Sequence, residues 1–222
     1  GAGLTTIAVS REALPVYAAA LESVMVKSIS AINDFEQLIA DQRVSAFLIG
    51  PGAGVLGSTR SRVLQLLSTG KPTVLDADAL TVFADDPSAL FNAIKGPCVL
   101  TPHEGEFGRI FDLQGSREVR AAEAAKQSNA IIVLKGSLTV IAAPNNLLIV
   151  NENAPPNLAT AGSGDVLAGM ILGLLAQNMD ATLASAAAVW MHGQAAQNFG
   201  PGLIAEDLPD CLPEVWRKLL AE

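Results

Sequence analysis

Short apolar runs alternate with segments of helical composition along most of the chain, and this alternation constrains the fold more than any other feature. The runs are rich in Val, Ile and Leu, which indicates buried β-strands. We expect strands over 4–9, 24–29, 46–49, 73–75, 98–100, 131–134, 139–142 and 147–150. Because strands joined through helices pair in parallel, the predicted fold is an α/β domain with three α/β/α layers around a mostly parallel sheet. The last two strands flank Asn145 and Asn146 and predict an antiparallel hairpin at the sheet edge.

Helical periodicity and capping residues predict the connecting segments. We expect helices over 15–21, 33–41, 58–67, 79–83, 87–93, 106–111, 117–128, 164–177, 181–198 and 210–220. Asn33 is predicted to cap the second of these helices, and Gly70 closes the third. Since no stretch of linker composition divides the 222 residues, we expect a single domain over 1–222.

Composition and charge exclude several classes of protein. Half of the residues are hydrophobic and only 16% are charged, which excludes a disordered chain. The net charge is −8 and the 14 Lys and Arg residues form no cluster, so a nucleic-acid partner is not expected. Segment 166–205 carries one charge, Asp180, but its Ala, Gly and amide residues favour buried helices over a membrane hairpin.

The two cysteines, Cys98 and Cys211, lie far apart in predicted buried elements, and we expect free thiols in a reducing cytoplasm. The start of the chain does not resemble a signal peptide. Two Cys and two His cannot form a metal cluster, so no metal site built by the protein is predicted.

Residues 157–169, NLATAGSGDVLAG, join three glycines and one acid to the start of an apolar helix. The first amides of a helix have no intrahelical partner and lie at the positive end of its dipole. Gly162, Ser163 and Gly164 therefore predict a cradle for a phosphate group, and Asp165 lies where a base would face the phosphoryl acceptor. The alternative is that Ser163 caps the helix and Asp165 only complements its dipole.

Conspicuous sequences follow the predicted strands and support the functional interpretation. They are GPGAG at 50–54, DADAL at 76–80, TPHEGE at 101–106, KGSLT at 135–139 and, later, AGSGD at 161–165. In an open α/β sheet, ligands bind outside the carboxyl ends of the strands, so we expect these sequences to line one crevice.

Several of these residues allow two interpretations. Gly50, Gly52 and Gly54 permit close approach to a ligand or form an ordinary turn. Asp76 and Asp78 can fix a ligand hydroxyl or hold Mg²⁺ through water, but Asp78 can equally cap the following helix.

The remaining polar candidates lie in the later motifs. His103 follows a proline at a strand end, where we expect ligand contact although a lone His is often structural. Glu104 and Glu106 are acids in the first turn of a predicted helix, and the alternative to a functional role is that they only complement the helix dipole. Lys135 can neutralise phosphate charge, and His192 lies in an apolar helix and is predicted to be part of the core.

The motifs GPGAG, LDADAL, LTPHEGEF, VLKGSLTVIA and NLATAGSGDVLAG, in this order, resemble those of the ribokinase-like NAD(P)H-hydrate dehydratases from residue 1 to about residue 200. The resemblance implies repair of the S epimer of hydrated NADH or NADPH, coupled to hydrolysis of ADP or ATP with Mg²⁺. It implies that Asp165 is the catalytic base and that the hydrated dinucleotide contacts Gly52, Gly54, His103 and Asp165. It further implies that the adenine nucleotide contacts Lys135, Gly136, Ser137, Leu138, Thr139, Gly162, Ser163 and Gly164.

The chain also departs from the pattern of the family. Members usually have a glycine-rich strand and a helix ahead of the GAGLTT segment, which here begins at Gly1. Ser163 replaces a usual Thr, Ala161 replaces a Gly, and APPN at 154–157 replaces a Thr-Gly-Asn run. The resemblance implies a homotetramer and, in some members, fusion to an NAD(P)H-hydrate epimerase domain. The competing hypotheses are a small-molecule kinase of the same superfamily and a nucleotide-binding regulatory protein without turnover.

Overall fold

The computed structural model describes residues 2–30 and 32–221. The strands are β1 (Thr6–Val9), β2 (Met25–Ser28), β3 (Phe47–Ile49), β4 (Thr73–Leu75), β5 (Cys98–Leu100), β6 (Ile131–Leu134), β7 (Thr139–Ala142) and β8 (Leu148–Asn151). The helices are α1 (Leu14–Ala20), α2 (Ile32–Ala40), α3 (Gly57–Ser68), α4 (Asp78–Thr81), α5 (Pro87–Ala93), α6 (Glu104–Ile110), α7 (Arg117–Ser128), α8 (Ser163–Leu175), α9 (Ala181–Phe199) and α10 (Leu208–Leu220). Short 3₁₀ turns lie at Pro156–Leu158 and Ala205–Asp207.

The main sheet has six strands, and their spatial order β3-β4-β5-β6-β7-β8 is the order of the chain. Strands β3 to β6 pair in parallel, whereas β7 is antiparallel to both β6 and β8. Asn146 adopts a left-handed conformation with φ 68° in the turn between β7 and β8. The mostly parallel sheet with an antiparallel edge hairpin is therefore confirmed.

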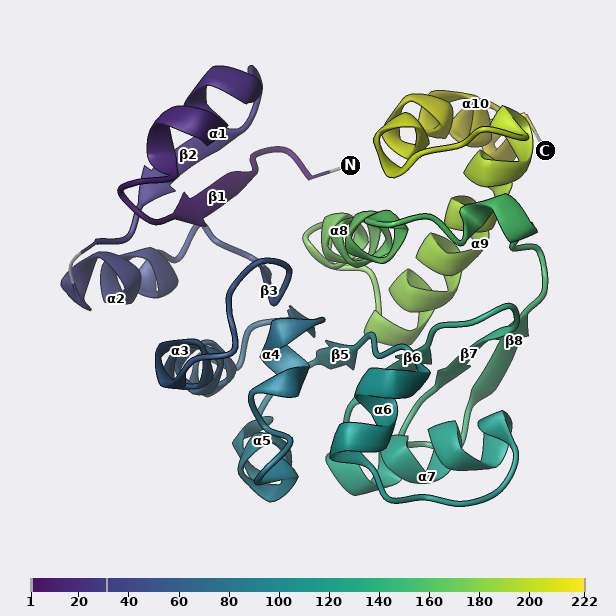
Figure 1. Cartoon of the computed structure of the whole chain (residues 1–222), viewed down its shortest axis with the longest axis horizontal. Helices are drawn as coiled ribbons and strands as arrows, with labels where there is room; N and C mark the ends of the chain where they lie inside the picture. The colour runs from purple at the N-terminus through teal and green to yellow at the C-terminus, as the bar shows by residue number, and fades with distance from the viewer. Residues whose placement is uncertain (1, 31, 222) are drawn as a thin grey trace.

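Neighbouring residues of each central strand face opposite layers of helices. Leu75 and Leu100 pack in the cluster that includes residues of α3 to α7, whereas Val74 and Val99 pack against α8 and α9. Figure 1 shows α6 and α7 on one side of the strands and α8 and α9 on the other. Because both faces are covered, the strands are apolar at nearly every position, as their sequences predicted.

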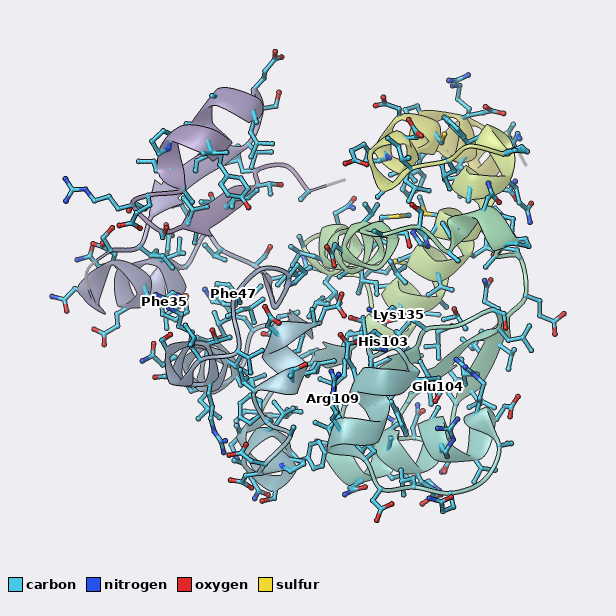
Figure 2. The ribbon with its side chains drawn as sticks, viewed as in Figure 1. Phe35, Phe47, His103, Glu104, Arg109 and Lys135 are labelled. Atoms are coloured by element: carbon cyan, nitrogen blue, oxygen red, sulfur yellow. The ribbon has the colours of Figure 1, made fainter. Side chains whose placement is uncertain are left out.

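The first two strands form a separate two-stranded parallel sheet rather than part of the main one. Figure 1 shows β1, β2 and α1 standing apart from the strands of the large sheet. The sequence predicts a single sheet, because a local pattern identifies a strand but not its pairing partner. A small cluster of Phe35, Phe47 and Leu66 connects α2 to β3 and α3; two of its members are labelled in Figure 2.

Several predicted helix ends differ from those in the structure by one or two residues. Helix α2 begins at Ile32, so Asn33 lies inside it and is not its cap; residue 31 lies outside the described residues. Helix α8 ends at Leu175 rather than at residue 177, and Asn178 follows it with φ 63°. Helix α10 begins at Leu208, two residues early, because a proline suits its first turn.

Both cysteines are free thiols, as predicted. Cys98 is buried in β5, and burial raises the pKa of its thiol to about 12. Within the described residues, no helix has both the length and the apolar character needed to cross a membrane.

Candidate active site

Four of the strand-end sequences meet at one edge of the sheet through a continuous series of contacts. The Gly54 amide donates to Asp78 Oδ2 at 2.8 Å, and Lys135 Nζ lies 2.7 Å from Asp76 Oδ1. Lys135 also forms an isolated parallel bridge with His103. These contacts join GPGAG, DADAL, TPHEGE and KGSLT in a single site, as the sequence predicted.

The fifth sequence, AGSGD, reaches this site by a different route from the one expected. Strand β8 ends at Asn151, and a 3₁₀ turn at Pro156–Leu158 separates it from the glycines, so AGSGD does not follow a strand directly. The amino end of α8 nevertheless lies against Lys135, because a Cβ atom placed on Gly164 would be only 3.2 Å from Lys135 Nζ. Packing of α8 on the sheet therefore brings the predicted cradle to the other four motifs.

The glycine-rich turn after β3 fits tightly against the turn after β4. Gly50 has φ 145°, and a Cβ atom at this position would lie 1.7 Å from the Asp76 carbonyl oxygen, so only glycine is accommodated. Gly52 and Gly54 have φ 67° and 78°. Gly52 has no neighbour that a Cβ atom would meet, which leaves its face open to a ligand.

The turn after β4 orients two carboxylates toward different parts of the site. Ala77 lies between them with φ 48° and ψ −119°, a conformation that is strained for any residue with a Cβ atom. The Asp76 side chain is 1% exposed and pairs with Lys135, while its Oδ2 atom is buried and has no partner among the described residues. Asp78 is the first residue of α4 and makes no capping bond, so the capping interpretation is wrong; its carboxylate instead holds the Gly54 amide.

His103 is the N-cap of α6, which begins at Glu104 rather than at residue 106. Its Nδ1 atom accepts from the amides of Gly105 at 3.0 Å and Glu106 at 3.3 Å. The Glu106 carboxylate accepts from the His103 amide at 3.0 Å, which completes a capping box. The His103 side chain remains 55% exposed, so one imidazole both stabilises the helix start and presents a surface to the site.

Figure 2 shows His103 beside Lys135, with Glu104, the first residue of α6, to the right of both. The Glu104 carboxylate pairs with Arg117 at 2.7 Å and with Arg120 at 2.9 Å. The hydrogen bond from Arg120 and the charge of Arg117 lower the pKa of Glu104. The first-turn acids of α6 therefore make specific side-chain contacts and do more than complement the helix dipole.

The turn after β6 is held by Arg117, a residue that the sequence analysis did not single out. Its Nη2 atom donates to the carbonyl oxygens of Leu134 at 3.1 Å and Lys135 at 3.0 Å. A Cβ atom on Gly136 would lie 2.5 Å from this guanidinium, so Gly136 is needed for the contact. The available signal was the position of Arg117 at the start of α7, because a cation is unfavourable at the positive end of a helix dipole.

Ser137 and Leu138 are exposed at the tip of the same turn. Thr139 is the first residue of β7 and is buried. Its hydroxyl donates to the Gly136 carbonyl at 3.3 Å. The tip of this turn is thus open to a ligand, whereas its base is fixed by internal bonds.

Gly162, and not Ser163, is the N-cap of α8, and its φ of 83° requires a residue that tolerates the left-handed region. Ser163 is the first helical residue, so the interpretation of its side chain as a cap is wrong. The Ser163 amide donates to the Thr160 carbonyl at 3.3 Å. Within the described part of the chain, no acceptor occupies the amides of Gly162 and Gly164, which fits a bound anion.

Asp165 lies in the first turn of α8 and is exposed. Partial burial and the charge of Asp76 raise the pKa of its carboxyl, while the charge of Lys135 lowers it. Two carboxylates and one ammonium therefore share this end of α8, and the net effect favours a carboxyl that accepts a proton more readily than usual.

His192 lies in α9 and is 6% exposed, which confirms its assignment to the core. Burial lowers the pKa of its imidazole to about 4, although a hydrogen bond with the Ser163 backbone opposes this shift. The buried ring therefore contacts the backbone at the start of α8.

A mostly parallel sheet with an antiparallel edge hairpin and helices on both faces defines a ribokinase-like α/β/α protein, and solved structures of this class share the fold. Comparison with known sequences narrows this class, because the family model for NAD(P)H-hydrate dehydratase matches residues 1–213. The chain belongs to the NAD(P)H-hydrate dehydratase family.

Individual relatives agree with this assignment. The chain is 37% identical over 243 residues to the bifunctional NAD(P)H-hydrate repair enzyme Nnr of Moorella thermoacetica, covering 100% of this chain and 45% of that protein. It is 37% identical to the ADP-dependent (S)-NAD(P)H-hydrate dehydratase of Bacillus subtilis, covering 80% of this chain and 66% of the relative. The structure of the Bacillus subtilis ADP/ATP-dependent NAD(P)H-hydrate dehydratase co-crystallized with ATP/Mg²⁺ has a TM-score of 0.83 and 33% identity, covering 97% of this chain and 79% of that one. The chain thus spans less than half the length of the Moorella relative.

Proposed function

We propose that this chain dehydrates the S epimer of hydrated NADH or NADPH back to the reduced dinucleotide, with ADP or ATP as co-substrate. The observation that carries the proposal is the group at the amino end of α8. There the Asp165 carboxylate and the Lys135 ammonium lie together with the amides of Gly162 and Gly164, which have no acceptor among the residues that the structure describes. A base, a cation and an anion cradle are what transfer of a phosphoryl group to a hydroxyl requires.

In the proposed reaction, Asp165 accepts the proton of the C6 hydroxyl as that oxygen attacks the terminal phosphorus of the nucleotide. The bond from phosphorus to the bridging oxygen breaks, and AMP leaves from ADP, or ADP from ATP. Lys135 and the cradle amides neutralise the charge that develops on the phosphoryl oxygens. The C6–O bond then breaks with loss of phosphate and of a proton from the neighbouring carbon, which restores the dihydropyridine ring.

The assignments of the dinucleotide and nucleotide sites follow the same geometry. We place the dinucleotide against Gly52, Gly54 and the exposed side of His103, with its C6 hydroxyl toward Asp165 of α8. We place the adenine nucleotide between the turn 135–139 and the start of α8.

Magnesium is expected to arrive with the nucleotide. Among the described residues, no three Asp, Glu, His or Cys side chains are grouped to hold a metal ion. Mg²⁺ prefers phosphate oxygens and water with few protein carboxylates, so the protein residues present do not form a cage for it. When bound to the phosphates, the ion offsets their negative charge, and the steps assigned above to protein residues do not depend on its position.

Other expectations concern the whole protein and remain proposals. They are fusion to or pairing with an epimerase domain as in the bifunctional relatives, a homotetramer, and a cytoplasmic location. Each rests on the family to which the chain belongs.

The direct test incubates the protein with hydrated NADH and ADP and follows the absorbance of the dihydronicotinamide. Recovery of NADH together with release of AMP and phosphate supports the proposal. A stable phosphorylated product would instead indicate a small-molecule kinase, and nucleotide binding without any product would indicate a regulatory protein.

A further inference from the structure

We propose that Asp76 is a positioning residue that fixes the Lys135 ammonium at the amino end of α8 before the nucleotide binds. The inference rests on the proposed function, because it assigns Lys135 to the phosphates. It adds a residue that acts through Lys135 and makes no contact of its own with the reacting atoms.

The geometry of the pair carries the proposal. Asp76 is 59 residues from Lys135 in the chain, yet its Oδ1 atom lies 2.7 Å from Lys135 Nζ. The Asp76 side chain is 1% exposed and that of Lys135 is 18% exposed, so water competes little with the contact. Breaking such a pair strands a buried charge, which makes the arrangement persistent.

The local backbone explains why the carboxylate points this way. Ala77 is held in a strained conformation, and the Gly50 backbone packs against the Asp76 carbonyl with no space for a side chain. These two features lock the turn on both sides of Asp76. Strain of this kind persists only where the surrounding structure enforces it, and it often serves to orient groups at a site.

The consequence for Lys135 is a loss of conformational freedom ahead of binding. A free lysine side chain has many rotamers, and holding one of them on a ligand opposes binding. The ammonium has three donors, so one can bind Asp76 while the others remain available for phosphate oxygens. Because Gly164 has no side chain, the Lys135 ammonium can lie close to the first turn of α8, 3.2 Å from where a Cβ atom of residue 164 would be.

The charge of Asp76 also repels a phosphate, and this effect opposes the positioning effect. The two are distinguished by a graded pair of substitutions. Asp76→Asn retains an acceptor for Lys135 without the charge, whereas Asp76→Leu is of similar size and has neither. Positioning predicts that Asp76→Leu weakens ADP binding by about three- to tenfold, and that Asp76→Asn weakens it less. Repulsion predicts that both variants bind ADP more tightly.

ADP affinity is measured by calorimetry in these variants, in Lys135→Met and in Lys135→Met combined with Asp76→Leu. If Asp76 acts through Lys135, the second substitution changes ADP affinity by less than about twofold when Lys135 is absent. Asp78→Asn is the matched control, since this acid lies two residues away and bonds to Gly54 instead of Lys135. Tighter ADP binding by Asp76→Leu, or independent effects of the two substitutions, would overturn the proposal.

A second measurement does not depend on turnover or on nucleotide. The rate at which an amine reagent labels Lys135, read by mass spectrometry, is compared with that of Lys126, which pairs with Glu123 on the surface. Loss of the Asp76 charge weakens the bond to Lys135 and makes the ammonium more mobile and reachable, so Asp76→Asn should raise the Lys135 rate relative to Lys126, while Asp78→Asn should not. Unchanged labelling in a folded Asp76→Asn variant refutes positioning. This readout stands if Asp76→Leu does not fold or if no dehydration is found.

Discussion

Replacing Asp165 by Asn tests the base assignment with the smallest change of shape. The side chain keeps its size and its place in the first turn of α8 but can no longer accept a proton. If Asp165 is the base, turnover should fall by roughly 10² to 10⁴, which is the usual contribution of general base catalysis. Nucleotide should still bind, because the amides of Gly162 and Gly164 and the Lys135 ammonium are unchanged.

The structure also limits what this variant does to stability. The pKa of Asp165 is raised in the folded chain, so its carboxyl favours folding at low pH, and that contribution is lost as pH rises through the raised pKa. At neutral pH the ionised group is therefore less favourable in the folded chain than in the unfolded one, and only its interaction with the helix dipole favours folding. Its loss should cost at most about 1 kcal/mol, which for a domain of this size is about 2 to 4 °C in Tm.

The assay compares kcat for dehydration, ADP affinity by calorimetry and Tm in one preparation. Asp180→Asn is the matched control, because Asp180 caps α9 by accepting from the amides of Thr182 and Leu183, and Asn caps equally well. Asp180 lies beyond the carboxyl end of α8, so the Asp180→Asn variant should have an unchanged kcat. Near-normal kcat in a folded Asp165→Asn variant would show that Asp165 is only an acid of the first helical turn.

Three further predictions follow from residues around this site. Gly50→Ala should destabilise the fold by about 2 to 4 kcal/mol in denaturant unfolding, because its Cβ atom would overlap the Asp76 carbonyl. Gly52→Ala, which meets no neighbour, should cost about 1 kcal/mol, and similar losses at both positions would contradict the packing argument. His103→Ala should raise KM for the hydrated dinucleotide more than it lowers kcat, and should lower the free energy of unfolding by about 1 kcal/mol through loss of the α6 cap; an unchanged KM would remove His103 from the binding site. His192 has its pKa lowered from 6.5 to about 4 by burial, so its contribution to stability is present above 6.5 and is lost as pH falls toward 4. The loss is about 3 kcal/mol, and melts across this range should show a shallower decline in His192→Asn than in the wild type.

The sequence predicted the main strands and helices because their signals are local. The helix α7 was placed correctly at both ends, since Ser116 caps it and Asn129 ends it in the left-handed region. The sequence does not show which residues pair when they lie far apart along the chain. Nothing local shows that β1 joins only β2, or that an acid and a lysine 59 residues apart form one buried pair.

In the candidate site too, some features could be found from the sequence and others depend on the folded backbone. Its motifs were found because glycines and charges after apolar strands are conspicuous in a sequence. The roles of His103 as a cap and of Asp78 as an acceptor for Gly54 depend on backbone geometry. The sequence left both residues with two interpretations, and of those for Asp78 the structure contradicts the capping role. Arg117 was overlooked because its contacts are with backbone carbonyls, which carry no signature in the sequence.

The order of the strands has a consequence for how the protein matures during synthesis. Every strand of the large sheet pairs with its neighbour along the chain, so the sheet can grow one strand at a time as the polypeptide leaves the ribosome. The cradle belongs to α8, which is made only after β8 is finished. A nascent chain that has completed its sheet already has Asp76 and Lys135 but lacks the amides that would hold a phosphate. Nucleotide capture is thus expected to be among the last properties the chain acquires, and it would stabilise finished molecules without trapping incomplete ones.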